Sequence, residues 1–178
     1  MADPSTDADR RPLQRLQTVA DLIETPALAR IYAYAEREDS VTVGELVDEL
    51  AIPQGTVYDY VQRLETAGLL RRINEGRPYE YDAEPISLTL SVDGATTTVT
   101  PTLVAAIARR EEDDDVDVYV ERHGLDGLAE ALEYAAGYVD GTVNHRTMAR
   151  ELDISPLEAE IILQALEPVA AAYSDTAE

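Results

Sequence analysis

The stretch that most constrains the fold is residues 42–82, where two amphipathic helical patterns flank a proline turn and precede a pair of strands. Thr42 is a predicted N-cap, and Glu45 three residues later completes a capping box. Apolar residues at helical spacing follow between 43 and 50. This helix must end before Pro53, because a proline disfavours the α conformation in the residue that precedes it.

A second helix is predicted over about residues 53–66, and its Pro53 suits the first turn, where the missing N–H needs no partner. Gly68 is a natural residue to end this helix. Its expected buried side is Val57, Val61 and Leu64, with Tyr60 beside them. Residues 69–82 then predict a hairpin with a turn at 74–76. Three arginines make this hairpin the most basic part of the chain: Arg71, Arg72 and Arg77.

This order of helix, tight turn, helix, glycine and basic hairpin is that of a winged helix-turn-helix. Residues 26–83, through TVGELVDELAIPQGTVYDYVQRLETAGLLRR and GRPYEYDAEP, resemble the MarR, ArsR and TrmB regulators, and above all uncharacterised haloarchaeal helix-turn-helix proteins. In those families the second helix enters the DNA major groove and the wing lies on the backbone or minor groove. The resemblance implies base-reading residues on the second helix: Gln54, Gly55, Thr56, Tyr58, Asp59, Gln62 and Arg63. It implies phosphate or wing contacts from Thr42, Arg71, Arg72, Arg77 and Tyr79.

Carboxylates on the same surfaces keep a second interpretation open. Asp59 lies on the face expected to meet DNA, and Glu80 and Asp82 lie on the wing. Residues 53–82 carry four arginines against five acids, whereas a DNA-binding face is normally positive. The alternative is therefore a winged-helix protein–protein interaction module that does not bind DNA.

The rest of the chain predicts helices with few strands, so the expected fold class is mainly α with small β (α+β). We expect a disordered tail (1–11), the winged helix-turn-helix domain (12–83), a β-hairpin (84–100) and a C-terminal helical module for oligomerisation or partner binding (101–178). Further helices are expected over 12–24, 25–39, from about residue 101, and over 125–139. The acidic run 111–117 is expected to be a solvated linker. One side of helix 12–24, formed by Leu13, Leu16, Ala20 and Ile23, suits either a dimer contact or packing on its own domain.

Residues 142–168 repeat the first helix-turn-helix pattern at a constant offset of 102. Leu46 corresponds to Met148, and Ile52 corresponds to Ile154. No basic wing follows this second, wingless repeat. Its second helix carries glutamates where a DNA reader would carry neutral or basic groups, so we expect it to serve packing, oligomerisation or partner binding.

The charge is extreme, since 36 acids oppose 14 basic residues for a net charge of −22. All 14 basic residues are arginine, and lysine is absent. Acids occur along the whole chain, which favours a solvated surface adapted to a halophilic archaeon over an acidic DNA mimic or an acidic-tail interaction protein. Multimolar salt screens charges to within about 3 Å, so self-repulsion is less prohibitive there. Residues 1–82, with 9 arginines and 16 acids, are less negative than residues 83–178, with 5 and 20.

The composition supports no catalytic or cofactor site, so we expect no enzyme activity, metal or cofactor. Cysteine is absent, which excludes disulfides and thiolate ligands. The two histidines, His123 and His145, lie in different segments, and no phosphate-binding glycine loop appears. No long apolar segment or signal peptide is apparent, so a cytoplasmic protein without membrane contact is expected.

The sequence therefore predicts a sequence-specific DNA-binding transcriptional regulator that binds double-stranded DNA as a homodimer. Its recognition helix would be residues 53–66, its wing residues 69–82, and any small-molecule effector is unknown. A positive patch formed by Arg63, Arg71, Arg72 and Arg77 would favour this function. Pairing of all four with acids would favour the protein-interaction module, and the acids expected as partners are Asp59, Glu75, Glu80 and Asp82.

Overall fold

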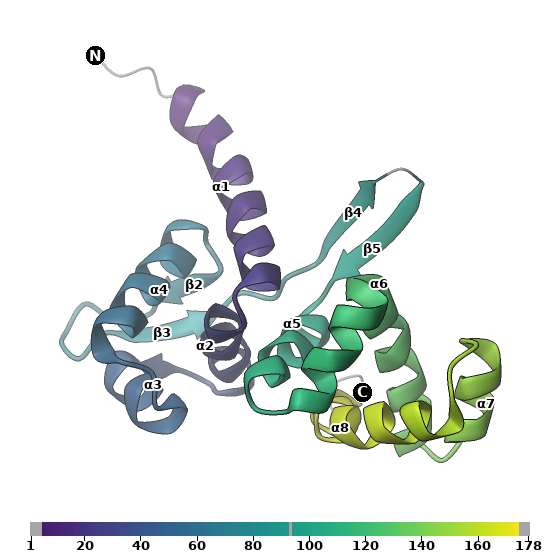
Figure 1. Cartoon of the computed structure of the whole chain (residues 1–178). Coiled ribbons are helices and arrows are strands. Elements are labelled where there is room, and N and C mark those ends of the chain that lie inside the picture. Colours follow the sequence, from purple (N-terminus) through teal and green to yellow (C-terminus); the bar gives the residue numbers. More distant parts are fainter. Residues whose placement is uncertain (1–4, 93, 175–178) are drawn as a thin grey trace. The chain divides into compact units, whose positions relative to one another are not determined.

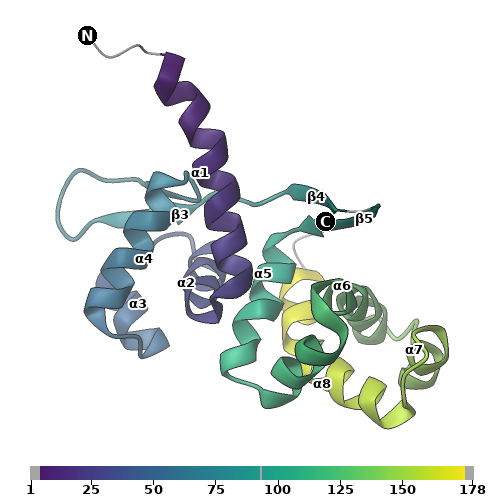
Figure 2. The same ribbon diagram turned by 45° about the horizontal axis from the view of Figure 1, so that its top comes forward.

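A computed structural model of the chain describes residues 5–92 and 94–174. Its backbone divides into two compact units. The first contains the residues up to Leu88 together with Thr98–Val104, and the second contains Thr89–Thr97 together with the residues from Ala105 onward. Helices dominate and the strands are short, which confirms the predicted mainly α fold with small β-sheets (Figures 1 and 2).

In its described residues up to Leu88, the first unit contains four helices and a three-stranded sheet. Its elements are α1 (Ser5–Glu24), α2 (Pro26–Arg37), β1 (Val41–Thr42), α3 (Val43–Leu50), α4 (Gln54–Thr66), β2 (Leu70–Arg72) and β3 (Glu80–Ala83). The predicted helices and wing strands are therefore present, although Pro53 precedes α4 instead of occupying its first turn.

Helix α1 is longer than the sequence pattern predicts. Residues 5–11, expected to belong to a disordered tail, form its first turns, while residues 1–4 of that tail lie outside the described residues. The C-terminal half of α1 packs into its own unit through three buried residues, Thr18, Val19 and Leu22. A helix that is anchored at one end extends easily, because each added residue closes a hydrogen bond without a new nucleation cost. The N-terminal half extends beyond the rest of the unit in both views (Figures 1 and 2).

Helix α3 begins and ends as predicted. The Glu45 N–H donates to Thr42 Oγ1 at 3.2 Å, and the Thr42 N–H donates to the Glu45 carboxylate at 2.7 Å, so the capping box is complete. The helix ends at Leu50, because Ala51 adopts the left-handed conformation with φ of 52°. Ile52 is buried immediately after this turn.

The wing is an antiparallel pair with a third strand that the sequence pattern did not reveal. Gly68 ends α4 with φ of 70°, and the Leu69 N–H bonds back to the Leu64 carbonyl at 2.9 Å. Strand β3 lies between β1 and β2, with Val41 opposite Tyr81 and Leu70 opposite Ala83. Strand β1 was missed because two residues carry no alternating pattern, and only pairing with β3 makes them a strand.

The core of the first unit lies between its helices and this sheet. Its largest fully buried side chains include Tyr32, Leu28, Ile31, Leu46, Leu64 and Leu69. The Tyr32 hydroxyl donates to the Glu84 carbonyl at 2.9 Å and accepts from the Ile86 N–H at 3.1 Å. Burial raises the pKa of Tyr32 well above its usual value, so the hydroxyl stays protonated and can satisfy both groups.

The β-hairpin predicted around the Asp93-Gly94 turn is present as β4 (Leu88–Val92) and β5 (Ala95–Val99), although Asp93 lies outside the described residues. The helices that follow are α5 (Pro101–Ala108), the 3-10 turn η1 (Arg109–Glu111), α6 (Asp114–Val139), α7 (His145–Glu151) and α8 (Pro156–Ser174). The Thr97 hydroxyl donates to the Asp126 carboxylate and so attaches β5 to α6 within the second unit.

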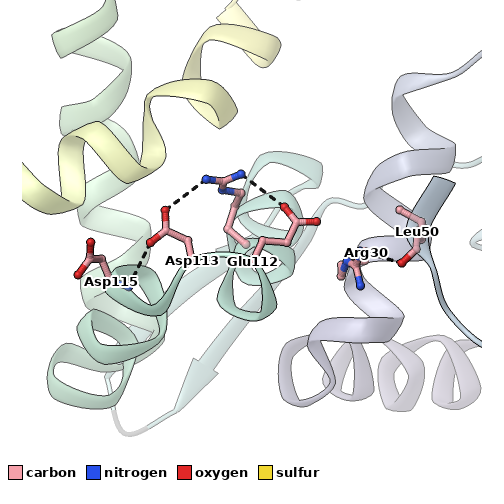
Figure 3. A network of polar contacts seen from close by, with 6 residues as sticks. Arg30, Leu50, Glu112, Asp113 and Asp115 are labelled. Carbon is pink, nitrogen blue, oxygen red and sulfur yellow. Dashed lines mark hydrogen bonds and ion pairs between the residues drawn. The ribbon is translucent and has the colours of Figure 1, made fainter.

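The acidic run 111–117 is not a linker, contrary to the prediction. Asp113 caps α6 by accepting from the Asp115 N–H at 3.1 Å, and three further aspartates occupy the first turn. Carboxylates stabilise a helix N-terminus because they face its positive dipole end and its unpaired N–H groups. Arg109 binds Glu112 at 3.4 Å and Asp113 at 3.2 Å, which fixes the approach to the cap (Figure 3). The predicted helix 125–139 is the second half of α6, after a break at Gly124 with φ of 69°.

The second unit contains the helix-turn-helix that the repeat predicts. Asn144 caps α7 through bonds from the N–H groups of Arg146 and Thr147, at the position 102 residues after Thr42. Asp153 adopts the left-handed conformation with φ of 54°, at the position 102 residues after Ala51. The two turns therefore share their cap, their left-handed residue and their spacing. Sequence similarity at the apolar positions reflects a repeated local geometry.

Candidate nucleic-acid interface

The turn before α4 is held from two sides, and this fixes the direction in which α4 leaves it. The left-handed Ala51 reverses the chain, and Ile52 anchors it in the core. Arg30 of α2 donates from Nη2 to the Leu50 carbonyl at 3.0 Å (Figure 3). Leu50 is the last residue of α3, so its carbonyl has no partner within the helix, and Arg30 supplies one. The second helix of the motif is thus rigidly positioned by residues outside it.

Helix α4 buries the predicted apolar side and exposes the other. Val57, Val61 and Leu64 are buried, and Tyr60 is half-buried, as expected. Seven sequence-predicted site residues occupy the remaining surface: Gln54, Gly55, Tyr58, Asp59, Gln62 and Arg63 are exposed, and Thr56 is half-buried.

The N-terminal half of α4 is the open part of this surface. Tyr58 exposes 55% of its area, although it is a large aromatic residue. A Cβ atom added at Gly55 would meet no atom within 4 Å, so no neighbour within the described chain requires a glycine there. Gln54 and Thr56 lie on the same two turns. This end of the helix presents amide, hydroxyl and aromatic groups to solvent.

The C-terminal half of α4 borders a polar groove shared with α1. Asp59, Gln62 and Arg63 line this groove, which has a volume of about 570 Å³, together with Asp21 of α1. Arg63 Nη2 lies 2.8 Å from Asp21 Oδ2. The Arg63 side chain is 48% exposed and that of Asp21 is 27% exposed, so water screens this ion pair and it is easily exchanged. Arg63 is therefore available to another anion at small cost.

The wing brings its arginines together with acids and with one tyrosine. Arg71 binds Asp82 at 3.0 Å across the strand pair, and it also lies 3.3 Å from Glu84. The register sets the first of these contacts, since Arg71 and Asp82 are directly opposite. Such exposed cross-strand pairs contribute roughly 0.2–1 kcal/mol.

Tyr79 lies between the other two wing arginines. The Arg72 guanidinium lies 4.2 Å from the Tyr79 ring centroid, and the Arg77 guanidinium lies 5.6 Å from it. Arg72 also binds Glu65 of α4 at 3.0 Å. Within the described residues Arg77 has no carboxylate partner, so it carries the least neutralised positive charge of the wing.

The predicted arginine patch is thus only partly realised. In the described part of the chain, three of its four arginines are paired, and of the four acids expected as partners only Asp82 binds one of them. In each of these pairs the arginine is exposed and the acid is half-buried. Thr42 differs from the other candidates, because its hydroxyl donates to the Glu45 carboxylate at 2.9 Å and already serves the cap.

The sequence analysis did not identify three residues that shape this surface: Asp21, Arg30 and Glu65. Asp21 is 42 positions from its partner Arg63, and Arg30 is 20 positions from Leu50. Side-chain pairs at such distances have no local spacing that could reveal them. Their identification requires the packing of α1, α2 and α4.

No group of three or more histidine, aspartate or glutamate side chains among residues 5–92 and 94–174 is arranged to hold a metal ion. Of the helices described, none combines the length and apolar character needed to cross a membrane.

Comparison with known families agrees with the geometry of the first unit. Residues 28–87 match the family described as sugar-specific transcriptional regulator TrmB. The first unit resembles a transcriptional regulator. The match covers α2, the helix-turn-helix formed by α3 and α4, and the wing. It therefore supports the assignment of this segment to a helix-turn-helix regulator family, and with it DNA binding. Residues 110–175 match a family of unknown function, DUF7437, which covers α6, α7 and α8. No curated protein and no solved structure matches the chain in these comparisons.

Proposed function

We propose that this chain is a cytoplasmic, sequence-specific DNA-binding transcriptional regulator of a halophilic archaeon, and that it binds double-stranded DNA as a homodimer. The observation that carries the proposal is the open N-terminal half of α4, where Tyr58 is 55% exposed beside an arginine-bearing wing. A buried aromatic would serve the core, whereas the exposed Tyr58 is available for contact with a partner. The similarity of residues 28–87 to TrmB regulators supports DNA as that partner.

Base edges are read by the N-terminal half of α4. In helix-turn-helix complexes the first residues of the recognition helix contact the bases in the major groove. Gln54 suits adenine, for which an amide can form two hydrogen bonds, and the Thr56 methyl suits the thymine methyl. Gly55 permits close approach of the DNA backbone to the helix, because it has no side chain. Asp59, Gln62 and Arg63 follow at the groove shared with α1.

Phosphates are bound by the wing. Arg77 has no carboxylate partner within the described residues, so it can bind a phosphate without first breaking an ion pair. Arg71 and Arg72 exchange their carboxylate partners for phosphates, and Tyr79 keeps Arg72 and Arg77 close together. Thr42 supports the interface through its cap, which fixes the start of α3.

The acidic composition is compatible with DNA binding in concentrated salt. A net charge of −22 repels DNA strongly in dilute buffer, but multimolar salt reduces the range of this repulsion to about 3 Å. Counterion release weakens under the same conditions. Recognition then depends on shape, base contacts and apolar burial, for which Tyr58, Thr56 and Tyr79 are suited.

The dimer places two α4 helices in successive major grooves about 34 Å apart. A two-fold symmetric operator follows from such a dimer. The second unit would supply the dimer contacts or bind a partner.

The test is capture and sequencing of genomic DNA fragments by the full chain in multimolar potassium chloride. Wild type is compared with Tyr58→Ala and Arg77→Ala, which alter exposed positions, and with Arg37→Ala as the charge-matched control on α2. Enrichment of a short two-fold symmetric motif that is weakened by the first two changes, and kept by Arg37→Ala, supports the proposal. A folded protein that enriches no sequence would refute it and would favour the protein-interaction module.

A further inference from the structure

Strands β4 (Leu88–Val92) and β5 (Ala95–Val99) form a sheet that contains only these two strands in the described part of the chain (Figure 1). Each strand therefore has one edge that pairs within the hairpin and one outer edge without a strand beside it. A two-stranded hairpin alone is only marginally stable in water, and further strands stabilise it. The hairpin thus presents two edges that can accept another strand.

The main-chain groups of Ser91 and Thr96 point towards these outer edges. Two residues separate β4 from β5, and in such a hairpin the pair that flanks the turn exchanges its main-chain hydrogen bonds. The next pair, Ser91 and Thr96, does not, so its N–H and C=O groups face outwards. Ser91 Oγ lies 3.2 Å from Thr96 Oγ1, as expected for residues directly opposite each other. Among the described residues, no other segment forms a main-chain hydrogen bond with either of them.

The outer edges also lack the charges that normally protect the edge of a sheet. Natural edge strands discourage further pairing with charged side chains or proline. Residues 86–100 contain one charged residue, Asp93 between the two strands, although 28% of the whole chain is charged. In the wing, by contrast, β2 and β3 carry two charged residues each. The chain therefore has charges on the strands of one sheet and none on those of the other.

Charge also decides which partner suits this sheet. Each copy of the chain carries a net charge of −22, so two copies repel unless the surfaces in contact are neutral. A two-fold axis places a strand opposite itself, and like charges directly opposite each other are destabilising. Strand β4 has no charged residue, so it can pair with the same strand of a second copy without this repulsion.

The edge of β5 suits such a contact less well. The Thr97 hydroxyl donates to Asp126 of α6, which places a carboxylate beside β5. Two β5 edges would bring two copies of this carboxylate together. The favoured edge is therefore that of β4.

We propose that β4 of one copy pairs antiparallel with β4 of a second copy, and that the resulting four-stranded sheet forms the homodimer. The outward N–H and C=O of Ser91 take part in the main-chain hydrogen bonds of this contact. Concentrated salt screens ion pairs, whereas these hydrogen bonds join groups without net charge. One two-fold axis at the hairpin edge closes the dimer, because the contact joins two copies of the same strand.

The contact supplies the dimer on which the proposed function rests, but its tests need no DNA. Ser91→Pro and Thr96→Pro each remove one outward N–H from the full chain. Both leave the hydrogen bonds within the hairpin in place, since proline is tolerated where the N–H faces away from the partner strand. Thr96→Pro is the matched control, because it makes the same change on the other edge.

Light scattering over a dilution series measures the dissociation constant of the dimer, and circular dichroism checks that each variant is folded. Ser91→Pro should raise this constant at least about tenfold, because the two-fold axis removes two donors from the contact at once. Thr96→Pro should dimerise as wild type does. A monomeric wild type would overturn the proposal. It would also be overturned by equal effects of the two changes, or by a larger effect of Thr96→Pro.

A second measurement leaves the main chain of the hairpin intact. The chain has no cysteine, so Ser91→Cys and Thr96→Cys each provide one site per copy for a nitroxide label. Both residues are exposed, and their side chains lie on the same face of the hairpin. Neighbouring strands lie about 4.8 Å apart, so pairing through β4 separates the two Thr96→Cys labels by up to about 10 Å more than the two Ser91→Cys labels.

Electron paramagnetic resonance measures both distances between labels. A shorter distance for Ser91→Cys is expected, whereas equal distances, or a shorter one for Thr96→Cys, would overturn the proposal. The contact and the regulator fail separately. A monomer that still enriches a specific DNA sequence would refute only the strand contact. A dimer through β4 that enriches no sequence would refute only the regulator.

Discussion

Releasing Arg63 from Asp21 should strengthen DNA binding. The substitution Asp21→Asn keeps the size of the side chain and removes its charge, so the 2.8 Å ion pair with Arg63 is lost. Arg63 then faces DNA without an internal competitor. The groove shared by α1 and α4 also loses a carboxylate that repels phosphate.

The magnitude follows from the exposure of the pair. Two unit charges 4 Å apart interact by about 1 kcal/mol in water, and measured exposed pairs contribute about 0.2–1 kcal/mol. With side chains 48% and 27% exposed, this pair belongs to that class, so the free energy of unfolding should fall by less than about 1 kcal/mol. The affinity for DNA should rise by up to about fivefold, which corresponds to at most about 1 kcal/mol.

The assay is fluorescence anisotropy with a short duplex of random sequence, at one potassium chloride concentration at which all variants are folded. A random duplex reports phosphate contacts, which dominate non-specific binding. Glu24→Gln is the control, because it removes one carboxylate from an exposed position of the same helix, outside the groove.

Asp21→Asn should strengthen binding more than Glu24→Gln does. Equal gains from both variants would mean that only the total charge matters. Unchanged binding by Asp21→Asn would mean that Arg63 does not reach DNA. Either result would refute the reasoning.

Three further predictions concern stability, each measured as the midpoint of denaturant unfolding. Ala51→Gly should stabilise the fold by about 0.5–1 kcal/mol. The left-handed conformation costs alanine about 1–2 kcal/mol, and the greater flexibility that glycine gives the unfolded chain offsets part of the gain. Destabilisation would contradict the turn geometry. Thr42→Ala should cost about 1 kcal/mol through loss of the cap, whereas Thr42→Ser should cost little. Tyr32→Phe should cost about 1–3 kcal/mol, because the Ile86 N–H loses its acceptor. Because the pKa of Tyr32 is raised on folding, its contribution is fully present below the unfolded pKa of 10 and is lost as pH rises through the higher folded value; the stability of wild type should therefore fall more steeply above pH 10 than that of Tyr32→Phe.

Local signals accounted for most of the first unit. The Thr42 and Glu45 pair fixed the start of α3, and Gly68 fixed the end of α4, because a cap and a positive φ depend on residues within one turn. The repeat at an offset of 102 predicted α7 and α8, because it reproduces the same local signals. The left-handed Ala51 and Asp153 share this offset although neither residue type nor hydropathy marks them.

The acidic run 111–117 shows where local reasoning failed. Its composition suits a solvated segment as well as a helix start, and the choice depends on the Asp113 cap and on Arg109, which binds two of its carboxylates. The predicted length of α1 was wrong for a similar reason. Its N-terminal extension depends on the C-terminal half, which is anchored at Val19 and Leu22.

The sequence by itself determined the helix-turn-helix, its wing, the wingless repeat and the face of α4 that is exposed, because periodicity, caps and turns act over a few residues. Only the tertiary structure decided which part of that face is open and which part borders α1. Packing of α1 beside α4 placed Asp21 against Arg63, pairing with β3 made a strand of Val41–Thr42, and the strand register set Arg71 opposite Asp82. These contacts join residues far apart in the chain, so their geometry depends on the packing of whole elements.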